Sequence, residues 1–465
     1  MINSIQQKIT NHKERGFYEG GKKTLANRDF WNGGDATFEE LASYDRNTMR
    51  SRARWLSANN AIMSNIDRSI INNVVGVGVA LDYDGTNKRL NKAIMDRFNS
   101  WANNRKLCDI TQRLTFSDIQ CSTIKSCLVD GEIYIHKIVT EEGLKLRLIE
   151  ADNLDESMGV GGVEIDKYGV PVRYHFRDLN NDTFSIPSSD IINYYQSERP
   201  SQYRGVSDYK QAIIDIKNFS AFQSSTIQAA RARANIGYTV TSPAPSGVFT
   251  QTVDGVQIEE IGGVAVKYLK PGEELKKLDP ENGGNDFKAF SEISIRLMAT
   301  ARSVSYELAF KDFSKVNYAS SRASLLQDYK RFDYEQNHLK EYFLDEIFEA
   351  WLDIEVMAGR IKIPKYLSTD KNKYLIQRWT WPQRPWVDPL KDVNAIEKEI
   401  ELGITNASDV AIARGNNYEV NMQKLSEQLK LQESLDVYDE MHPNKIDVVD
   451  EENEDDIEDK ELIND

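Results

Sequence analysis

The sequence predicts a helix-rich α+β protein, and two observations lead to this class. Long stretches place apolar residues at helical spacing, at 45–76, 207–235, 286–305 and 319–357. Short runs between 131 and 196 instead alternate apolar and polar residues, as antiparallel strands do. Several short antiparallel strands beside helices are typical of α+β domains.

Capping and breaking residues set the expected helix ends. The first long helix should break around "SANN" and stop at Gly76, with a strand in "VVGVGVALD" after it. Further helices are expected over about 87–106 and in "LTFSDIQCSTIKSCLVDG". Ser207 is a plausible N-cap for the 207–235 helix, because its hydroxyl can accept a hydrogen bond from a first-turn amide.

The expected strands form two groups. "EIYIHKIV", "LKLRLIEADNL", "GGVEIDKYGVPVRYHFRD" and "IPSSDIINYYQ" make up the first group, with "DKYG" as a hairpin turn. Residues 236–285 hold short β-like runs broken by Pro and Gly, which indicates a small insertion between two helices. "YLIQRWTW" should be a further strand, followed by two C-terminal helices with Gly403 between them.

Charge and composition exclude some classes of protein. The 465 residues carry a net charge of −15, the wrong sign for gripping nucleic acid by neutralising its phosphates. Residues 447–465 hold 11 acidic residues and one lysine, and removing their −10 leaves −5 for the rest. Such a tail is expected to stay solvated, with a docking segment as the alternative. No signal peptide and no run of 18 apolar residues is found, so we expect a protein made in a cytoplasm, with no membrane partner.

Signals of catalysis are weak. "NVVGVGV" has a G-x-G but lacks a third glycine in register and any following G-K-S/T. Cys108, Cys121 and Cys127 are too far apart for a usual zinc pair, so we expect buried reduced thiols, and His136 as an ordinary strand residue. The serines of "SSRAS" lack a nucleophile motif, and Ser320 or Ser321 is expected to cap the following helix. We therefore predict no enzyme, no cofactor and no metal, although distant acids could still assemble a two-metal nuclease site.

Several stretches, taken in order, resemble phage portal proteins of the lambda family. They run over about residues 45–437 and include "RSRARWLSANN", "SCLVDGEIYI", "LRLIEADNL", "GVEIDKYGVPVRYHF", "PSSDIINYYQSERPSQYRGVS", "ARSVSYELAFKDFSKVNYASSRASL" and "WVDPLKDVNAIEKEIELGITNASDVAIARGNN". No single stretch is diagnostic, but their order and spacing together are specific. The resemblance implies a virion protein, assembled in the host cytoplasm, that forms a homo-oligomeric ring of usually twelve subunits at one capsid vertex.

The resemblance also implies a function and partners. Double-stranded DNA would be packaged and ejected through the ring. The terminase large subunit, a head-tail adaptor, and the major capsid and scaffold proteins would dock on it. A head-completion or capsid structural protein, or a metal-dependent nucleic-acid enzyme, is the alternative.

A portal-type subunit has a wing, a helical stem, a small β-containing clip and a helical crown. The resemblance places these parts as follows: an N-terminal arm at 1–44, wing at 45–206, stem helices at 207–235 and 286–306, clip at 236–285, tunnel loop at 307–318, wing helix and return strand at 319–387, crown helices at 388–437 and an acidic disordered tail at 438–465.

Candidate site residues follow from these parts. Lys311, Lys315 and Arg322 would form rings of positive charge around the channel, or act as ordinary loop charges. Arg231 and Arg233 would line the channel or pair with acids of a neighbouring subunit, and the second role is favoured. The clip would face terminase or a connector with Glu259, Glu260, Lys267, Glu273 and Glu274.

Overall fold

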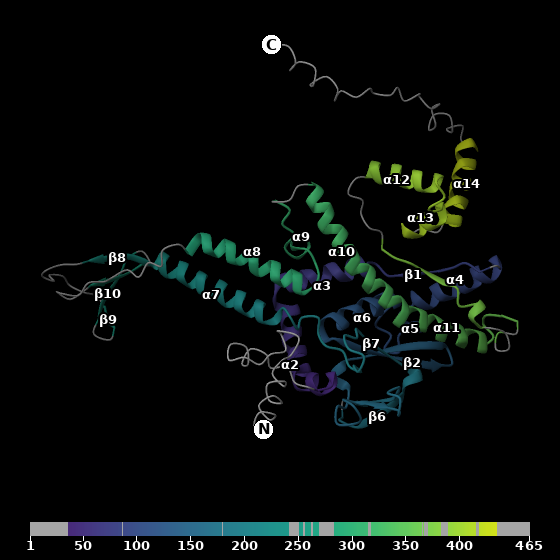
Figure 1. Ribbon diagram of the computed structural model, residues 1–465, viewed down its shortest axis with the longest axis horizontal. Helices are drawn as coiled ribbons and strands as arrows, with labels where there is room; N and C mark the ends of the chain where they lie inside the picture. The colour runs from purple at the N-terminus through teal and green to yellow at the C-terminus, as the bar shows by residue number, and fades with distance from the viewer. Residues whose placement is uncertain are drawn as a thin grey trace, which may run out of the picture. The chain divides into compact units, whose positions relative to one another are not determined.

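The computed structural model describes residues 36–434, apart from 86, 179, 241–250, 254–255, 262–263, 269–282, 315–317, 365, 367–370, 383–388 and 415–417 (Figure 1). The chain forms two compact units. One comprises Met1–Ile71 and Ala102–Lys362, and the other Asn72–Trp101 and Ile363–Asp465. The helix-rich α+β class predicted from the sequence is confirmed, with small and mainly antiparallel sheets. The N-terminal arm and the acidic tail fall mostly outside the described residues.

The first long helical stretch is two helices. α2 (Phe38–Asn59) begins with a capping box, in which Thr37 and Glu40 satisfy each other's backbone amides. At Asn60 the backbone becomes extended, and the Asn60 side chain accepts hydrogen bonds from the amides of Ile62 and Met63. This side chain starts α3 (Ala61–Val74), so the predicted break at "SANN" is confirmed.

The core of the first unit lies between a three-stranded sheet and the helices that pack against it. β2 (Glu132–Thr140) is the central strand, between β3 (Gly143–Ile149) and β7 (Ile191–Tyr195). α6 (Phe116–Asp130) and α11 (Asp345–Met357) pack against this sheet. A short helix, α5 (Arg105–Cys108), contacts β3.

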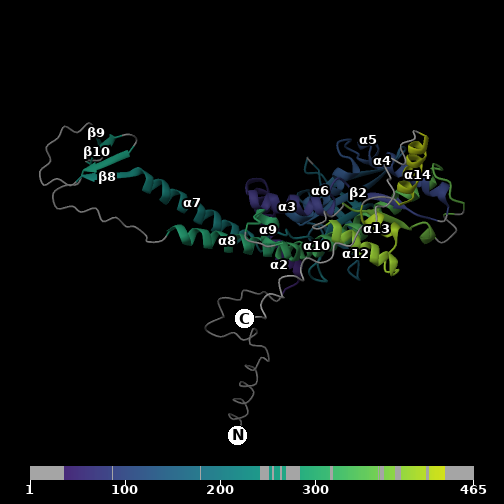
Figure 2. The same cartoon turned by 90° about the horizontal axis from the view of Figure 1, so that it is seen from above.

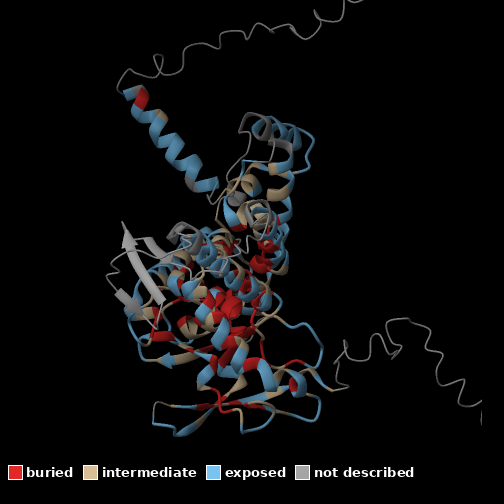
Figure 3. Ribbon diagram, turned by 90° about the vertical axis from the view of Figure 1, so that its left-hand side faces the viewer, coloured by how far each residue is buried: buried red, intermediate tan, exposed pale blue. Residues whose placement is uncertain are grey.

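A second sheet of β4 (Val163–Ile165), β5 (Pro171–Arg177) and β6 (Thr183–Pro187) adds Phe176 and Tyr174 to this core. Both rings meet Tyr134 edge-on, at 5.3 and 5.6 Å between centroids. Buried residues are red in Figure 3. The predicted "DKYG" hairpin turn is confirmed, because Asp166 accepts hydrogen bonds from the amides of Tyr168 and Val170.

Two long helices, α7 (Ile213–Asn235) and α8 (Gly283–Ala301), run side by side (Figure 2). The ring of Phe222 lies 5.8 Å from that of Phe287 and 4.2 Å from that of Phe290. Between the two helices in sequence is the expected β insertion. Its strands pair in the order β8-β11-β10-β9: β8 (Ile236–Val240), β9 (Gln251–Val253), β10 (Val256–Ile261) and β11 (Val264–Tyr268).

The prediction that Ser207 caps the α7 helix is wrong, since α7 begins six residues later. Ser207 does accept a hydrogen bond from the Tyr209 amide, but it closes a turn. Tertiary contacts hold this turn out of the helix: the Asp208 amide donates to the Leu128 carbonyl, and the Tyr209 hydroxyl donates to Asp67 at 2.6 Å.

After α8, a short helix, α9 (Tyr306–Phe310), leads to the long helix predicted over 319–357. That helix is observed as α10 (Tyr318–Leu339), a π-helical segment (Lys340–Leu344) and α11. Ser320 and Ser321 lie inside the first turn of α10, so neither caps it. The cap prediction is wrong because the helix begins at Tyr318.

The second unit joins distant parts of the sequence. β1 (Ala80–Tyr83) pairs antiparallel with β12 (Gln377–Thr380), and α4 (Lys88–Ala102) packs Phe98 against Trp379. The expected strand in "VVGVGVALD" thus begins only at Ala80, since Gly76 and Gly78 hold positive φ angles in a turn.

Three C-terminal helices complete the described part of this unit. α12 (Pro389–Glu401) is terminated by Gly403, as predicted. Gly403 has a positive φ angle, and the Ile404 amide donates to the Glu399 carbonyl. The single helix expected after it is two helices, α13 (Ala407–Ala413) and α14 (Tyr418–Ser434). "GNN" separates them in sequence, and these residues have low helix propensity.

A buried ion pair holds the segment before α7 against the sheet. Arg204 and Glu132 are both fully buried, and Nε and Nη2 of Arg204 donate to Glu132 Oε1 at 2.8 and 2.6 Å. Glu132 also accepts hydrogen bonds from the Tyr134 hydroxyl and the Gly205 amide. Burial alone would raise the pKa of Glu132, but the charge and hydrogen bonds of Arg204, together with the charges of Arg50 and Arg46, hold this pKa below its ordinary value.

Two glycines permit this close approach. A Cβ on Gly205 would lie 2.0 Å from the carbonyl oxygen of Gly131, which has a φ of 95°. Next to this contact, Arg54 binds Asp130 with two hydrogen bonds of 2.7 and 2.9 Å. The turn from α6 into β2 is thereby bound to both α2 and the segment before α7.

We expect Arg204→Met to lower the free energy of unfolding by about 3–5 kcal/mol, because Glu132 would stay buried without its hydrogen-bonded partner, with only the longer 3.6 Å ion pair to Arg50 left. Removing both charges in Arg204→Met/Glu132→Leu should recover part of this loss. The control is Arg173→Met, which removes only an exposed hydrogen bond to Ser185. Urea unfolding at one protein concentration measures all three, and equal losses for Arg204→Met and the control would contradict the prediction.

Asp152 predicts an acid-sensitive contribution to stability. Burial raises the pKa of Asp152, but hydrogen bonds and charge from Arg50 and Arg54 lower it overall. A carboxyl whose pKa is lower in the folded state contributes its full stabilisation above its unfolded pKa of about 4. This contribution is lost as the pH falls from there through the pKa of the folded state. Asp152→Asn should therefore cost more stability at pH 6 than at pH 3. A cost that is the same at both pH values would count against this role.

Candidate functional site

The α7–α8 hairpin is apolar on surfaces that its own chain does not cover. Near the body of the unit, Ile216, Phe219 and Met298 are buried. Other large apolar side chains of both helices are exposed by 39–58%: Ile214, Ile227, Phe290, Ile293 and Leu297. Of the apolar residues at helical spacing in the predicted 207–235 stretch, Tyr209, Ala212, Ile213, Ile216 and Phe219 are buried, whereas Ile227 and Ala230 are exposed.

Arg302, directly after α8, anchors the base of this hairpin. It is fully buried, and its guanidinium donates to Asp208 at 2.7 Å and to Asp67 of α3 at 3.0 Å. It also lies over the Tyr209 ring, 4.3 Å from the centroid. Burial alone would lower the pKa of Arg302, but the two carboxylates raise it. The start of α7 and the end of α8 are thus held at one point of α3.

The same cluster reaches α10. Arg331 lies 3.4 Å from Asp208 and 2.6 Å from Glu335, which accepts a hydrogen bond from Gln196. Burial raises the pKa of Glu335, and Arg331 opposes that shift only in part. A displacement of α10 would therefore separate buried charges from their partners, which resists movement of this helix.

Lys311 lies at the end of α9, in the loop predicted to be the tunnel loop. It is exposed and has a φ of 56°, a left-handed backbone conformation that glycine adopts more readily. The neighbouring Phe310 and Phe313 are 47% and 55% exposed. The described part of the loop, up to residue 314, therefore presents Lys311 beside two aromatic rings, and its start is fixed by the Ser305 cap of α9.

The structure places the other predicted cations differently. Lys315 lies outside the described residues. Arg322 is half-buried in the second turn of α10 and has an interaction partner in the chain, so it is no simple loop charge. Arg231 is exposed near the end of α7, two residues before Arg233, whose side chain falls outside the described part.

Three of the five predicted clip residues lie in strands of the four-stranded insertion. Glu259 and Glu260 are in β10, opposite Val266 and Ala265 of β11, and Lys267 is in β11 opposite Ile258. No side chain of these strands is described, and Glu273 and Glu274 fall in the segment 269–282, outside the described residues.

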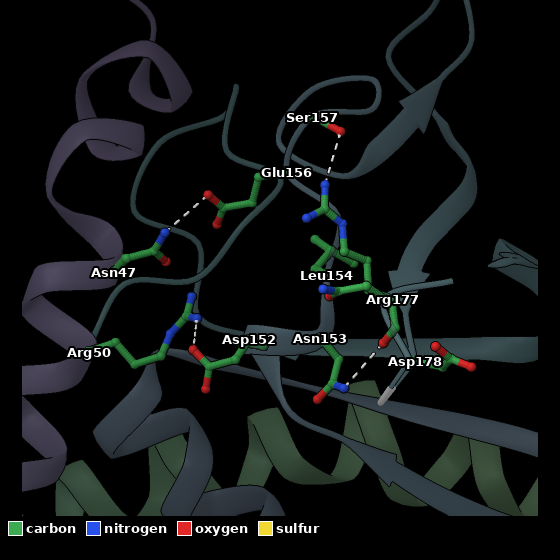
Figure 4. A pocket seen from close by; sticks show the side chains of 11 residues that line it. Asn47, Arg50, Asp152, Asn153, Leu154, Glu156, Ser157, Arg177 and Asp178 are labelled. Carbon is green, nitrogen blue, oxygen red and sulfur yellow. Dashed lines mark hydrogen bonds and ion pairs between the residues drawn. The ribbon is translucent and has the colours of Figure 1, made fainter. Parts of the chain in front are cut away.

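A polar pocket that sequence reasoning missed lies beside α2 (Figure 4). Its volume is about 370 Å³, and its lining includes Arg50, Asp152, Glu156, Arg177 and Asp178. Arg50 is almost fully buried, and its Nε has no hydrogen-bond partner among the described residues. Because the lining comes from α2 and three separate segments between 151 and 181, no local pattern could have predicted it.

The thiols behave as the sequence predicts. Cys108 and Cys127 are buried, Cys121 is half-buried, and none forms a disulfide. Burial raises the pKa of Cys108 to about 12, so its reactive thiolate form is scarce at neutral pH. His136 lies in β2, and burial lowers its pKa. Among the described residues, no three His, Cys, Asp or Glu side chains form a possible metal site, and no helix is long and apolar enough to cross a membrane.

Comparison with solved structures finds distant likenesses. The neck of a native gene transfer agent particle, computed with C12 symmetry, contains a chain 14% identical to this one, at a TM-score of 0.40. The match covers 80% of this chain and 93% of that chain. An HK97 family phage portal protein from Corynebacterium diphtheriae is also 14% identical, at a TM-score of 0.30, over 78% of this chain and 99% of that one. Both TM-scores are low, so these structures support no detail of this chain.

Sequence comparison is more decisive. The chain is 25% identical over 436 residues to a probable portal protein of Halomonas phage phiHAP-1, covering 86% of this chain and 83% of the relative. It is 18% identical over 376 residues to portal protein B of Escherichia phage lambda, covering 69% and 70%. A family model described as phage portal protein, lambda family, matches residues 25–336, which is more than half of the chain. The chain therefore belongs to the lambda family of phage portal proteins, which are structural components of the virion and not enzymes.

Proposed function

We propose that copies of this chain, twelve as is usual for portals, form a ring at one capsid vertex through which DNA is packaged and ejected. The observation that carries this proposal is the exposed apolar surface of the α7–α8 hairpin. Several large apolar side chains left exposed on one hairpin favour an interaction site, since burying apolar surface gains about 25 cal/mol per Å². Neighbouring hairpins in a ring would bury it.

Ring closure explains why the apolar residues lie on more than one side. In a cyclic oligomer above a dimer, each subunit uses two different faces, one toward each neighbour. α7 exposes Ile214 and Ile227, and α8 exposes Phe290, Ile293 and Leu297. We assign α7 and α8 to the stem, the strands between them to the clip, and residues 307–318 to the tunnel loop.

The charge balance suits a channel in which DNA slides. Acidic walls repel the phosphate backbone over the Debye length of about 10 Å and prevent tight binding. In this arrangement, one Lys311 from each subunit gives a ring of positive charge that makes short-lived phosphate contacts. Lys315 and Arg322, which lies in the second turn of α10, would add to this ring.

Docking of partners is assigned to the clip. Its strands carry Glu259, Glu260 and Lys267, and Glu273 and Glu274 follow them in sequence. These acids would meet terminase during packaging and a head-tail adaptor afterwards. Arg231 and Arg233, near the end of α7, would pair with the clip acids of a neighbouring subunit, because opposite charges across an interface fix its register. Capsid and scaffold proteins would contact the outer surface of the ring.

Ile293→Asp/Leu297→Asp should convert rings into small species in mass photometry and negative-stain images. An unpaired carboxylate in an apolar contact costs several kcal/mol, and every interface of the ring would carry two. Ile293→Met/Leu297→Met keeps the surface apolar and should form rings. Lys288→Glu, an exposed position of the same helix, controls for added negative charge.

Two results would contradict the ring. One is a parent protein that stays monomeric at micromolar concentration. The other is an Asp variant that assembles as well as the Met variant. Circular dichroism of each variant should match the parent, which separates lost assembly from lost folding.

Lys311→Glu/Lys315→Glu should leave ring assembly unchanged and alter the length of packaged DNA or its retention. The reason is that a ring of attractive charges becomes a ring of repulsive ones. Lys311→Gly removes the charge without opposing the left-handed backbone, so it tests charge loss alone. Lys330→Glu, exposed on α10, is the control for charge elsewhere on the subunit. Normal DNA length, retention and ejection in the double variant would exclude Lys311 from the channel function.

A further inference from the structure

The three C-terminal helices lack a core of their own. Among the side chains described between 393 and 434, only Gln432 is buried. Large apolar residues are exposed instead, and in Figure 3 the ribbon of α14, just before the C-terminal trace, is largely in the exposed colour. The described part of α12, α13 and α14 therefore carries large apolar side chains that its own chain does not bury.

Helices of this size need a packing partner. α12, α13 and α14 have 13, 7 and 17 residues. Isolated helices shorter than about 12–15 residues are marginal in water, and most helix stability in proteins comes from burying an apolar face. The expected partner must therefore offer an apolar surface that matches the faces of α12 and α14.

The spacing of the apolar residues shows which kind of surface fits. On α14, Tyr418, Met422, Leu425 and Leu429 follow one another at intervals of four, three and four residues. The first three are 38–45% exposed. An alternation of three and four averages 3.5 residues, which is the repeat of a coiled-coil seam. α14 is thus shaped to pack along another helix.

α12 carries the matching surface. Val393, Ile396 and Ile400 follow at intervals of three and four residues, and Val393 and Ile400 are 43% and 39% exposed. Because the stripes on both helices are exposed, α12 and α14 of one chain do not cover each other. One chain therefore presents two different apolar stripes of the same period.

The residues beside the α14 stripe favour a second copy over a highly charged partner. Asn421, Ser426 and Gln428 flank the stripe and are uncharged. Glu419 also flanks it and is paired with Lys88 of its own chain at 2.8 Å. The α12 stripe is flanked by Glu397 and Glu399. Because the flanks of the α14 stripe are mostly uncharged, α14 of one copy could approach α12 of another with little like-charge repulsion, and flanking charges decide partner choice in coiled coils.

We infer that the α14 stripe of one subunit packs on the α12 stripe of the next subunit, forming a second helical contact around the ring. The inference rests on the proposed ring, which requires two different faces on each subunit. It adds an assembly contact outside the α7–α8 hairpin. It also gives α12 and α14 the apolar partner that they lack within one chain.

Disulfide trapping tests this pairing. Ile396→Cys/Leu425→Cys places one thiol in each stripe, in a Cys121→Ala background that removes the half-buried native thiol. Assembled protein treated with a mild oxidant should give a ladder of covalent multimers on a non-reducing gel, and a reductant should collapse it. The control pair Ile396→Cys/Leu431→Cys uses an exposed residue on the opposite side of α14 and should give no ladder.

Each result supports or overturns the inference. A fast-migrating monomer without a ladder would mean that the stripes meet within one chain. Equal ladders from both pairs would mean random collisions, and rings without any ladder would place the stripes apart. Each of these three results overturns the contact.

Mass photometry of the same reduced samples shows whether only the α12–α14 contact is refuted or the proposed ring as well. Rings without a ladder refute only the α12–α14 contact. The absence of rings refutes the ring itself, and the contact with it. As a second readout, Met422→Asp/Leu425→Asp should make residues 389–434 at least tenfold more sensitive to protease within intact rings, whereas Glu427→Lys on the outer side of α14 should not.

Discussion

The buried pair of Glu132 and Arg204 is the contact on which the rest of the first unit depends. Glu132 follows directly after the α6–β2 turn, and Arg204 lies nine residues before the start of α7, so one ion pair joins the sheet to the segment that leads into the helical hairpin. Glu39 of α2 extends the contact by accepting hydrogen bonds from the Tyr203 and Arg204 amides. Such a pair is expensive to desolvate, and what it gains is a fixed geometry, since losing either partner leaves a buried charge.

A rigid base allows the hairpin to leave apolar surface uncovered. Arg302 ties the end of α8 to Asp67 and Asp208, so both helices are held at their base by charge and need not bury every apolar side chain within one chain. In the proposed ring, the exposed Ile293 and Leu297 of α8, and Met422 and Leu425 of α14, would be available to other subunits. Assembly of such a ring and folding of each subunit would then use the same hydrophobic effect, divided between contacts within the chain and contacts between chains.

Sequence patterns predicted most elements but misplaced several ends. Period and capping residues predicted the break at Asn60, the "DKYG" turn and the end of α12 at Gly403, because these depend on neighbouring residues alone. The start of α7 was misplaced at Ser207, because contacts to Leu128 and Asp67 hold the intervening turn. Of the candidate channel residues, Lys311 is exposed in its loop, whereas Arg322 is half-buried and has an interaction partner in the chain. The burial of Arg322 depends on how α10 packs, and no local pattern shows this.

The sequence by itself determined the class of fold, the family and the long helices, since periodicity, composition and the order of similar stretches are properties of the linear chain. Only the tertiary structure decided which charges are buried. Glu132 and Arg204 are 72 residues apart, and Asp67 and Arg302 are 235 apart, so no local pattern pairs them. The tertiary structure also decided which apolar residues stay exposed. An amphipathic helix has the same spacing of apolar residues whether its own chain or another subunit covers them.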